Sequence, residues 1–391
     1  MLKTGYSPWP SFTPEEADAV SRVLLSNRVN YWTGEETRYF EKEFASWVGA
    51  EYGIALGNGT LALEVAVRAF QPSPEDEVIV PPRTFIATAS AVVTAGARPV
   101  FADVDRETQG LSAETIERAI TPRTKGIIVV HLAGMACDMD PIMELARSRG
   151  LFVIEDCAQC HGGMYKGRHL GTIGDIGAWS FCQDKIMTTG GEGGMVTTDR
   201  RDLWSRMWSF KDHGKSWEAV YERQHPLGFR WLHESIGSNY RMLEMQAVIG
   251  RIQLRRMADW TARRTSIASA LEEVLAAFSS IRIPKPRFDF VHAYYRVYAF
   301  ARPENLASGW TRDRIAAEIN EAGAVCLHGT CSEIYLEKAF MDSPSRAVER
   351  LEVARELGER SLAFLVHPTL TDEEIERTTS AIKSVLEKAT R

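Results

Sequence analysis

Three segments of the chain carry residue types that suit chemistry on a phosphate or a carbonyl group. The first is Gly57-Asn58-Gly59-Thr60, which links an apolar run to a helical pattern. Free backbone N–H groups at a helix start, together with a threonine hydroxyl, suit a phosphate. A plain glycine turn with an Asn or Thr cap gives the same pattern. The segment lacks the Gly-x-Gly-x-x-Gly spacing, which argues against a nicotinamide or flavin site.

The second and third segments carry two carboxylates and a lysine. The buried strand pattern from residue 152 ends in Glu155 and Asp156, and an inward-facing carboxylate needs a cationic partner. Lys185 stands on a turn before the four-glycine loop 190–194. Glycines let the chain pass close to a flat ligand, and a partly buried amine can attack an aldehyde. An ordinary ion pair and a surface lysine are the alternatives.

Together these segments match one cofactor, pyridoxal 5'-phosphate. Its phosphate needs a helix start, its ring nitrogen needs a carboxylate, and its aldehyde needs a lysine.

The elements that position these residues alternate along the first half of the chain. A capping box with proline at the first helical position opens a helix at residues 14–25. The strands that we then predict are 53–56, 77–80, 99–102, 126–131, 151–155, 177–181 and 195–198. The helices that we predict between them are 60–70, 86–94, 113–120 and 141–148, the last capped by Asp140 and ended by Gly150. Such alternation predicts an α/β fold with a mostly parallel sheet flanked by helices.

The pattern changes after about residue 240. A long helical pattern covers residues 243–275, and short strands (281–283 and 292–300), a helix (313–322) and two terminal helices follow. We therefore predict a large domain, 1–255, and a smaller α+β domain, 256–391, on which the N-terminal segment can also pack. A chain of 391 residues fits two domains.

Composition excludes several classes of protein. Hydrophobic residues make up 45% and charged residues 25% of the chain, which is ordinary globular usage. The 46 basic and 52 acidic residues give a net charge of −6, so no nucleic-acid surface is expected. No run is apolar enough for a membrane span or a signal peptide, and the six cysteines follow no regular spacing. We expect a cytoplasmic protein with reduced thiols.

Longer motifs around the same residues resemble the sugar aminotransferases of the DegT/DnrJ/EryC1/StrS family, which have fold type I among pyridoxal phosphate enzymes. The family's Glu-Asp-x-Ala-Gln-x-His-Gly pattern stands at residues 155–162. Its Gly-Asp-x-Gly-x-x-Ser-Phe, lysine and Gly-Glu-Gly-Gly blocks stand at 174–181, 185 and 191–194. Segments 58–63, 84–89 and 239–242 also match, so the resemblance covers nearly the whole chain.

The resemblance implies a role for each matching residue. Lys185 would hold the cofactor as a Schiff base and then move the substrate proton, and Asp156 would keep the ring nitrogen protonated. Gln159 would bind the phenolic oxygen, and Phe85 would lie over the ring. The phosphate would be held by Gly59, Thr60 and Ser180. Asn239 would reach the phosphate of the neighbouring subunit, which implies a homodimer with shared active sites.

The segment between Lys185 and Asn239 looks longer than in many relatives, and its extra length falls in 211–230. Cations there alternate with aromatic rings, which suits a nucleotide diphosphate and its base. We name His213, Lys215 and Arg230 as candidate substrate-binding residues, with a solvated surface loop as the alternative. Cys157 and Cys160 form a Cys-x-x-Cys, but there is no second such pair, and we predict no metal site.

The predicted function is therefore transfer of an amino group, from glutamate by family analogy, to a nucleotide-linked keto-deoxy sugar. The alternative acceptor is a keto-cyclitol of the inosose type. Lys185 argues against the dehydratase branch, in which histidine replaces the lysine. A non-catalytic protein that only senses pyridoxal phosphate is the alternative from another class. The chain shows no DNA-binding segment, which argues against such a regulatory protein.

Overall fold

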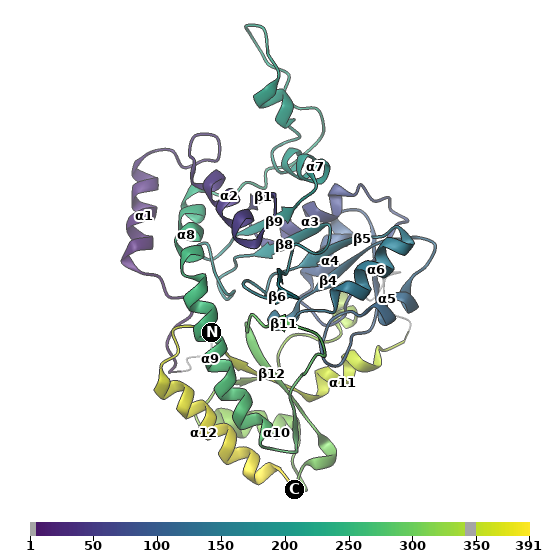
Figure 1. Cartoon of the computed structure of the whole chain (residues 1–391), viewed down its shortest axis with the longest axis vertical. Coiled ribbons are helices and arrows are strands. Elements are labelled where there is room, and N and C mark those ends of the chain that lie inside the picture. Colours follow the sequence, from purple (N-terminus) through teal and green to yellow (C-terminus); the bar gives the residue numbers. More distant parts are fainter. Residues whose placement is uncertain (1–4, 341–348) are drawn as a thin grey trace.

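The computed structural model describes residues 5–340 and 349–391, and a large mixed sheet lies at its centre (Figure 1). The strand order is β1-β9-β8-β5-β4-β2-β3. The strands are β1 (Tyr52–Leu56), β2 (Glu77–Val80), β3 (Arg98–Phe101), β4 (Thr124–Val130), β5 (Phe152–Asp156), β8 (Ile176–Ser180) and β9 (Gly194–Thr198). The sequence predicts all seven of these strands to within two residues at each end.

One strand departs from parallel pairing. β9 runs antiparallel to both β1 and β8, whereas the neighbours from β8 to β3 pair in parallel. Between β8 and β9 the chain forms only a loop, so it returns without a helical crossover and the strand direction reverses.

Helices cover both faces of this sheet, because the side chains of each strand alternate between two cores. In β1, Ile54 and Leu56 pack with α3 and α7, whereas Ala55 belongs to the opposite core with α2. The helices of this region are α1 (Pro14–Leu25), α2 (Glu36–Val48), α3 (Gly59–Ala69), α4 (Ala87–Thr94), α5 (Ala113–Ala119), α6 (Met139–Arg149), α7 (Arg201–Lys211) and α8 (Glu244–Arg255).

The predicted helices are confirmed with two corrections. α6 begins at Met139 after Asp138, so the predicted cap at Asp140 is wrong; Pro141 fits inside the first turn, where its missing N–H costs no hydrogen bond. The single helix predicted over 243–275 is two helices, because Arg256 ends α8 before α9 (Met257–Ala276) begins. The sequence analysis did not identify α2 or α7.

The remaining residues build a second, antiparallel sheet with the order β10-β12-β14-β13. Its strands are β10 (Ile281–Arg282), β12 (Arg296–Ala301), β13 (Cys326–Leu327) and β14 (Ser361–Leu365). The helices beside it are α9, α10 (Arg312–Glu321), α11 (Glu352–Arg360) and α12 (Asp372–Ala389). A third, three-stranded sheet consists of β11 (Phe290–Val291), β6 (Met164–Tyr165) and β7 (Arg168–His169).

The N-terminal segment lies against the C-terminal part of the chain. The Tyr6 hydroxyl hydrogen-bonds to Thr378 of α12 at 2.7 Å, and the Trp9 ring stacks on His367. The division into domains at residue 255 stays a prediction. In the described ranges, no helix is long and apolar enough to cross a membrane.

The part of the chain that connects α7 to α8 forms a long arm, which projects from the large-sheet region (Figure 1). It contains a π-helical turn, Glu218–Glu222, and its base is closed by a bridge between Lys215 and His233. The Ser216 N–H also donates to the Leu232 carbonyl at 3.0 Å. Beyond this bridge, Leu227, Phe229 and Trp231 are exposed.

Candidate active site

The residues predicted to hold a cofactor lie on segments that follow β1, β5 and β8, which all point in one direction. The Gly57–Thr60 segment follows β1, Asp156 ends β5, and Ser180 ends β8 ahead of Lys185. Because the carboxyl ends of parallel strands meet at one edge of a sheet, these side chains share that edge.

A tight cradle forms where the start of α3 meets the end of β8. Asn58 caps α3 by accepting a hydrogen bond from the Leu61 N–H at 3.0 Å. A Cβ atom on Gly59 would lie 2.5 Å from Ser180 Cβ, so only glycine allows the two segments to approach this closely. Thr60 is exposed beside them. Gly59, Thr60 and Ser180 are therefore brought together at a helix start, whose first N–H groups lack helical partners and suit a phosphate.

Asp156 is a buried carboxylate at the same edge. It accepts hydrogen bonds from the Thr88 hydroxyl at 2.8 Å and from the Ala158 N–H at 3.2 Å. Burial raises its pKa, although these hydrogen bonds and the Lys185 charge act in the opposite direction. A cationic group beside it would stabilise its ionised form.

Lys185 is mostly enclosed, with 15% of its side chain exposed. Its Nζ lies 5.2 Å from the centre of the Tyr295 ring and 3.8 Å from Asp184 Oδ1. The Tyr295 hydroxyl donates to the other oxygen of Asp184, and the Trp9 indole donates to the Lys185 carbonyl at 2.8 Å. Asp184 and Tyr295 thus lie near the amine of this lysine, and Trp9 holds its backbone.

Two further predicted residues lie on neighbouring loops. Phe85, between β2 and α4, is 67% exposed although it is a large apolar ring. Gln159 Oε1 accepts a hydrogen bond from the Ala133 N–H at 2.7 Å, which fixes the orientation of the amide and leaves its NH2 group to donate.

Asn239 is exposed on the segment that joins the projecting arm to α8. Its backbone pairs with Asp212, and the next carbonyl, that of Tyr240, accepts from the Gly57 N–H at 3.0 Å. The segment therefore touches the cradle of its own chain. Its predicted reach to a neighbouring subunit stays a prediction.

The three candidate substrate residues have different surroundings. Lys215 forms an ion pair with buried Asp212 at 2.8 Å and lies over the Trp32 ring, so its charge is already matched within the fold. His213 is exposed and has a positive φ of 59°. Arg230 is exposed farther out, on the arm beyond the Lys215–His233 bridge. Their role in binding a substrate stays a prediction.

Next to Asp156, Glu155 is also buried but has a structural role. Its Oε2 lies 2.9 Å from His131 Nε2, and its Oε1 accepts from the N–H groups of Ile173 and Gly174 at 2.7 Å. Burial alone would raise its pKa, but the His131 hydrogen bond and the backbone donors bring it below its usual value. His131, Glu155 and Cys157 lie close enough to hold a metal ion. The Cys137 N–H donates to His131 Nδ1, however, so the histidine already uses both nitrogens within the protein.

Sequence reasoning missed Thr88, Asp184, Tyr295 and Trp9 at this site. Thr88 lies within the matched segment 84–89 and Asp184 directly precedes Lys185, so both positions were available from the sequence. Trp9 and Tyr295 lie more than one hundred residues from Lys185 in the sequence, and only the folded chain brings them to it.

Comparisons with known proteins show which family the chain is similar to. The sequence pattern of the DegT/DnrJ/EryC1/StrS aminotransferase family matches residues 10–383. The GDP-perosamine synthase of Escherichia coli O157:H7 is 36% identical over 366 residues, which is 94% of each chain. The solved structure of an aminotransferase from Psychrobacter cryohalolentis has a TM-score of 0.96 at 59% identity, covering 98% of this chain and 99% of that one. DesV of Streptomyces venezuelae, solved in complex with a ketimine intermediate, has a TM-score of 0.85 at 30% identity, covering 95% of this chain and 94% of that one.

Proposed function

Because this chain belongs to the DegT/DnrJ/EryC1/StrS aminotransferase family, we propose that it is a pyridoxal-phosphate-dependent enzyme that aminates a nucleotide-linked keto-deoxy sugar, with glutamate as the amino donor. The observation that carries this proposal is the grouping of a glycine cradle, the buried acid Asp156 and the enclosed amine Lys185 at one edge of the sheet.

The residues present fit the cofactor. The close approach of Gly59 to Ser180 leaves a helix start open for a phosphate. Asp156 is buried and, within the described residues, accepts hydrogen bonds only from Thr88 and Ala158. A protonated ring nitrogen would supply the cation that this carboxylate needs. Phe85 exposes a ring that a flat ligand would cover.

When bound, pyridoxal phosphate supplies an aldehyde that accepts an amine and a ring that accepts carbanion electrons. In the proposal, Asp156 holds the proton on the ring nitrogen, and Thr88 orients this carboxylate through the 2.8 Å hydrogen bond. The Gln159 amide donates to the phenolic oxygen, and Phe85 covers one face of the ring. Lys185 would be the amine that holds the cofactor's aldehyde, and it would also be the group that moves the proton at the reacting carbon.

The names of relatives support a nucleotide-linked acceptor. The Escherichia coli relative is a GDP-perosamine synthase, and perosamine is an amino sugar. We propose the same class of acceptor here, without assigning the nucleotide or the ring carbon, and place the enzyme in the cytoplasm.

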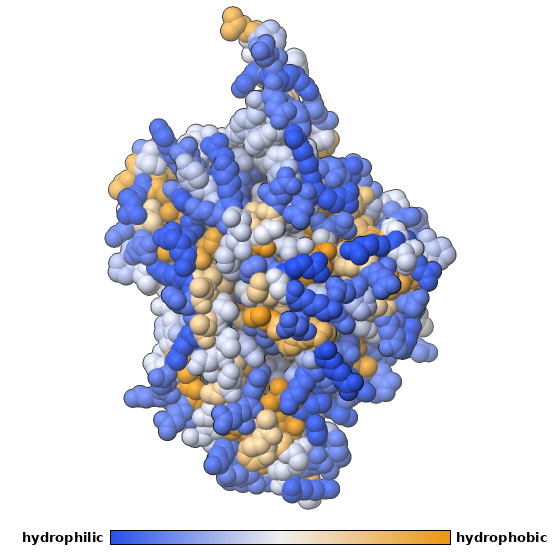
Figure 2. All heavy atoms as spheres, viewed as in Figure 1, coloured by the Kyte–Doolittle hydropathy of each residue, from blue (hydrophilic) through white to orange (hydrophobic). Residues whose placement is uncertain are grey.

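We also propose a homodimer. Three large apolar side chains of the projecting arm are exposed, namely Leu227, Phe229 and Trp231. Figure 2 shows a small hydrophobic group at the tip of this projection. Exposed apolar groups of this kind mark interaction surfaces. Asn239 stands at the base of the same arm, so a second copy that covered the arm would also lie near the cradle.

The experiment is spectroscopic. Purified protein loaded with pyridoxal phosphate should be yellow, and glutamate should bleach it; a nucleotide-linked keto-sugar should then restore the colour, whereas inosose should not. Lys185→Ala should remove both colour changes. A yellow protein that glutamate leaves unchanged would indicate a sensor, and normal transamination by Lys185→Ala would refute the assignment of this lysine.

A further inference from the structure

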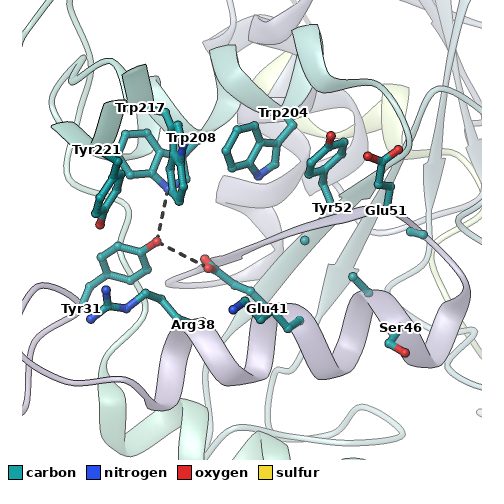
Figure 3. Close-up of a pocket in the computed structure, with 14 residues that line it drawn as sticks. Tyr31, Arg38, Glu41, Ser46, Glu51, Tyr52, Trp204, Trp208, Trp217 and Tyr221 are labelled. Carbon is teal, nitrogen blue, oxygen red and sulfur yellow. Dashed lines mark hydrogen bonds between the residues drawn. The ribbon is translucent and has the colours of Figure 1, made fainter. Parts of the chain in front are cut away.

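A large pocket lies apart from the residues predicted to hold the cofactor (Figure 3). It has a volume of about 650 Å³, and it is bounded by α2, the start of β1, α7 and the π-helical turn at the base of the arm. None of the predicted cofactor-binding residues lines it. It flanks the first residues of β1, Tyr52 and Gly53, whereas the phosphate cradle follows the last residue of that strand.

Aromatic rings form one wall of the pocket. Trp204 stacks on Tyr52 with ring centres 5.1 Å apart, and it meets Trp217 edge-on at the same distance. Trp217 in turn contacts Tyr221 at 4.3 Å. Figure 3 shows these rings facing the polar side chains of α2 across the pocket. An aromatic wall of this kind offers flat apolar area to a ligand at low conformational cost.

The opposite side carries polar groups with spare hydrogen-bonding capacity. The Arg38 Nε atom is buried and has no hydrogen-bond partner within the described residues. Glu41 Oε1 accepts from the Ala55 N–H at 3.0 Å, whereas among the described residues Oε2 receives only a long contact of 3.5 Å from the Tyr31 hydroxyl. Unpartnered buried polar atoms are costly, so a ligand that hydrogen-bonds to them would be favoured.

The charges of the pocket are balanced. Its charged lining residues are two acids, Glu41 and Glu51, and two bases, Arg38 and Lys42. Buried Lys211 does not line the pocket; it lies 3.5 Å from Glu41, and the charge of the neighbouring Asp212 also acts on it. A diphosphate needs a surplus of cations, which this lining does not provide. A sugar hydroxyl, in contrast, can donate to a carboxylate and accept from a guanidinium at the same time.

We propose that this pocket is a second binding site, separate from the transamination site, for the neutral pyranose ring of a carbohydrate. The apolar C–H face of the ring packs on the wall formed by Trp204 and Trp217. Its hydroxyl groups donate to Glu41 and accept from the guanidinium group of Arg38. Trp217 and Tyr221 belong to the aromatic segment that we suggested, from the sequence, as a nucleotide-binding surface. Because the charges around them are balanced, we expect a neutral sugar here instead of an anion.

The test is a calorimetric titration of the full-length, cofactor-loaded protein with neutral disaccharides (cellobiose, maltose and lactose). At least one should bind saturably. Trp204→Ala should raise its Kd about tenfold, the order expected for loss of one aromatic anchor. Arg38→Gln, which changes a partly exposed side chain, should also weaken binding, and thermal melting would verify that both variants fold.

The matched control is Trp310→Ala, which removes a partly exposed tryptophan outside the pocket and should leave the Kd unchanged. Bleaching by glutamate should be unchanged in all three variants, so the result is independent of the proposed function. Absence of saturable binding for all three disaccharides would overturn the proposal. The proposal would also be overturned if Trp204→Ala and Arg38→Gln weakened the binding of uridine monophosphate but left disaccharide binding unchanged.

Discussion

Gly59→Ala tests the cradle by adding one methyl group at its narrowest point. The new Cβ would lie 2.5 Å from Ser180 Cβ and 2.9 Å from Ser180 Oγ, both shorter than any ordinary contact. Restoring a contact of about 3.5 Å requires the two segments to separate by about 1 Å. Overpacking of this kind costs about 1–3 kcal/mol of folding stability, and a 1 Å displacement at a binding site can cost about 100-fold in function.

The matched control is Gly57→Ala, two residues earlier in the same loop. A Cβ on Gly57 would lie 3.5 Å from the Leu61 side chain, which is an ordinary contact. The assay is absorbance titration of cofactor-free protein with pyridoxal phosphate, together with thermal melting. We expect Gly59→Ala to fold but to bind the cofactor at least about tenfold more weakly, and Gly57→Ala to bind it like the parent protein. Equal cofactor affinity for a folded Gly59→Ala variant and the parent would refute the assignment of the cradle.

Three further predictions concern other parts of the molecule. Asp156→Asn removes a charged hydrogen bond worth about 1.5–3 kcal/mol, so kcat/KM should fall about 10- to 100-fold, measured by steady-state kinetics with glutamate; an unchanged value would exclude Asp156 as the partner of the ring nitrogen. Arg230→Ala should raise KM for the keto-sugar without changing bleaching by glutamate, whereas unchanged kinetics would leave Arg230 as a surface residue. Burial lowers the pKa of His161 from 6.5 to about 3, so between these values the unfolded chain binds a proton that the folded protein does not. The free energy of unfolding should therefore fall as the pH drops below 6.5, by up to about 1.4 kcal/mol per pH unit from this residue, and urea unfolding of His161→Phe should show a shallower pH dependence.

The strands of the large sheet could be predicted from the sequence because each is a short apolar run, and the residues after it are typical of a turn or a helix start. Asp156 at the end of β5 and Gly59 at the start of α3 are examples, since their places follow from strand and helix boundaries. Antiparallel β9 was not evident, because a strand's direction depends on the connection before it and not on its own composition.

Side chains that support the site are harder to predict because they come from distant segments. Tyr295 contacts Asp184 and Trp9 contacts Lys185, although both come from segments more than one hundred residues away in the sequence. The pairing of Lys215 with Asp212 is a local contact, but its strength depends on the burial of Asp212 beneath Arg241, which no local pattern reports. Charged residues in a segment can therefore be paired within the protein, so their presence in the sequence alone does not identify a binding surface.

Reduction of the pyridoxal-phosphate-loaded protein with borohydride, followed by peptide mass mapping, tests the central claim most directly. Reduction fixes the cofactor to whichever amine holds it. We expect the added mass on the peptide that contains Lys185, and we expect Asp156→Asn to leave this position unchanged while weakening catalysis. A label on another lysine, or no label on a yellow protein, would contradict the account.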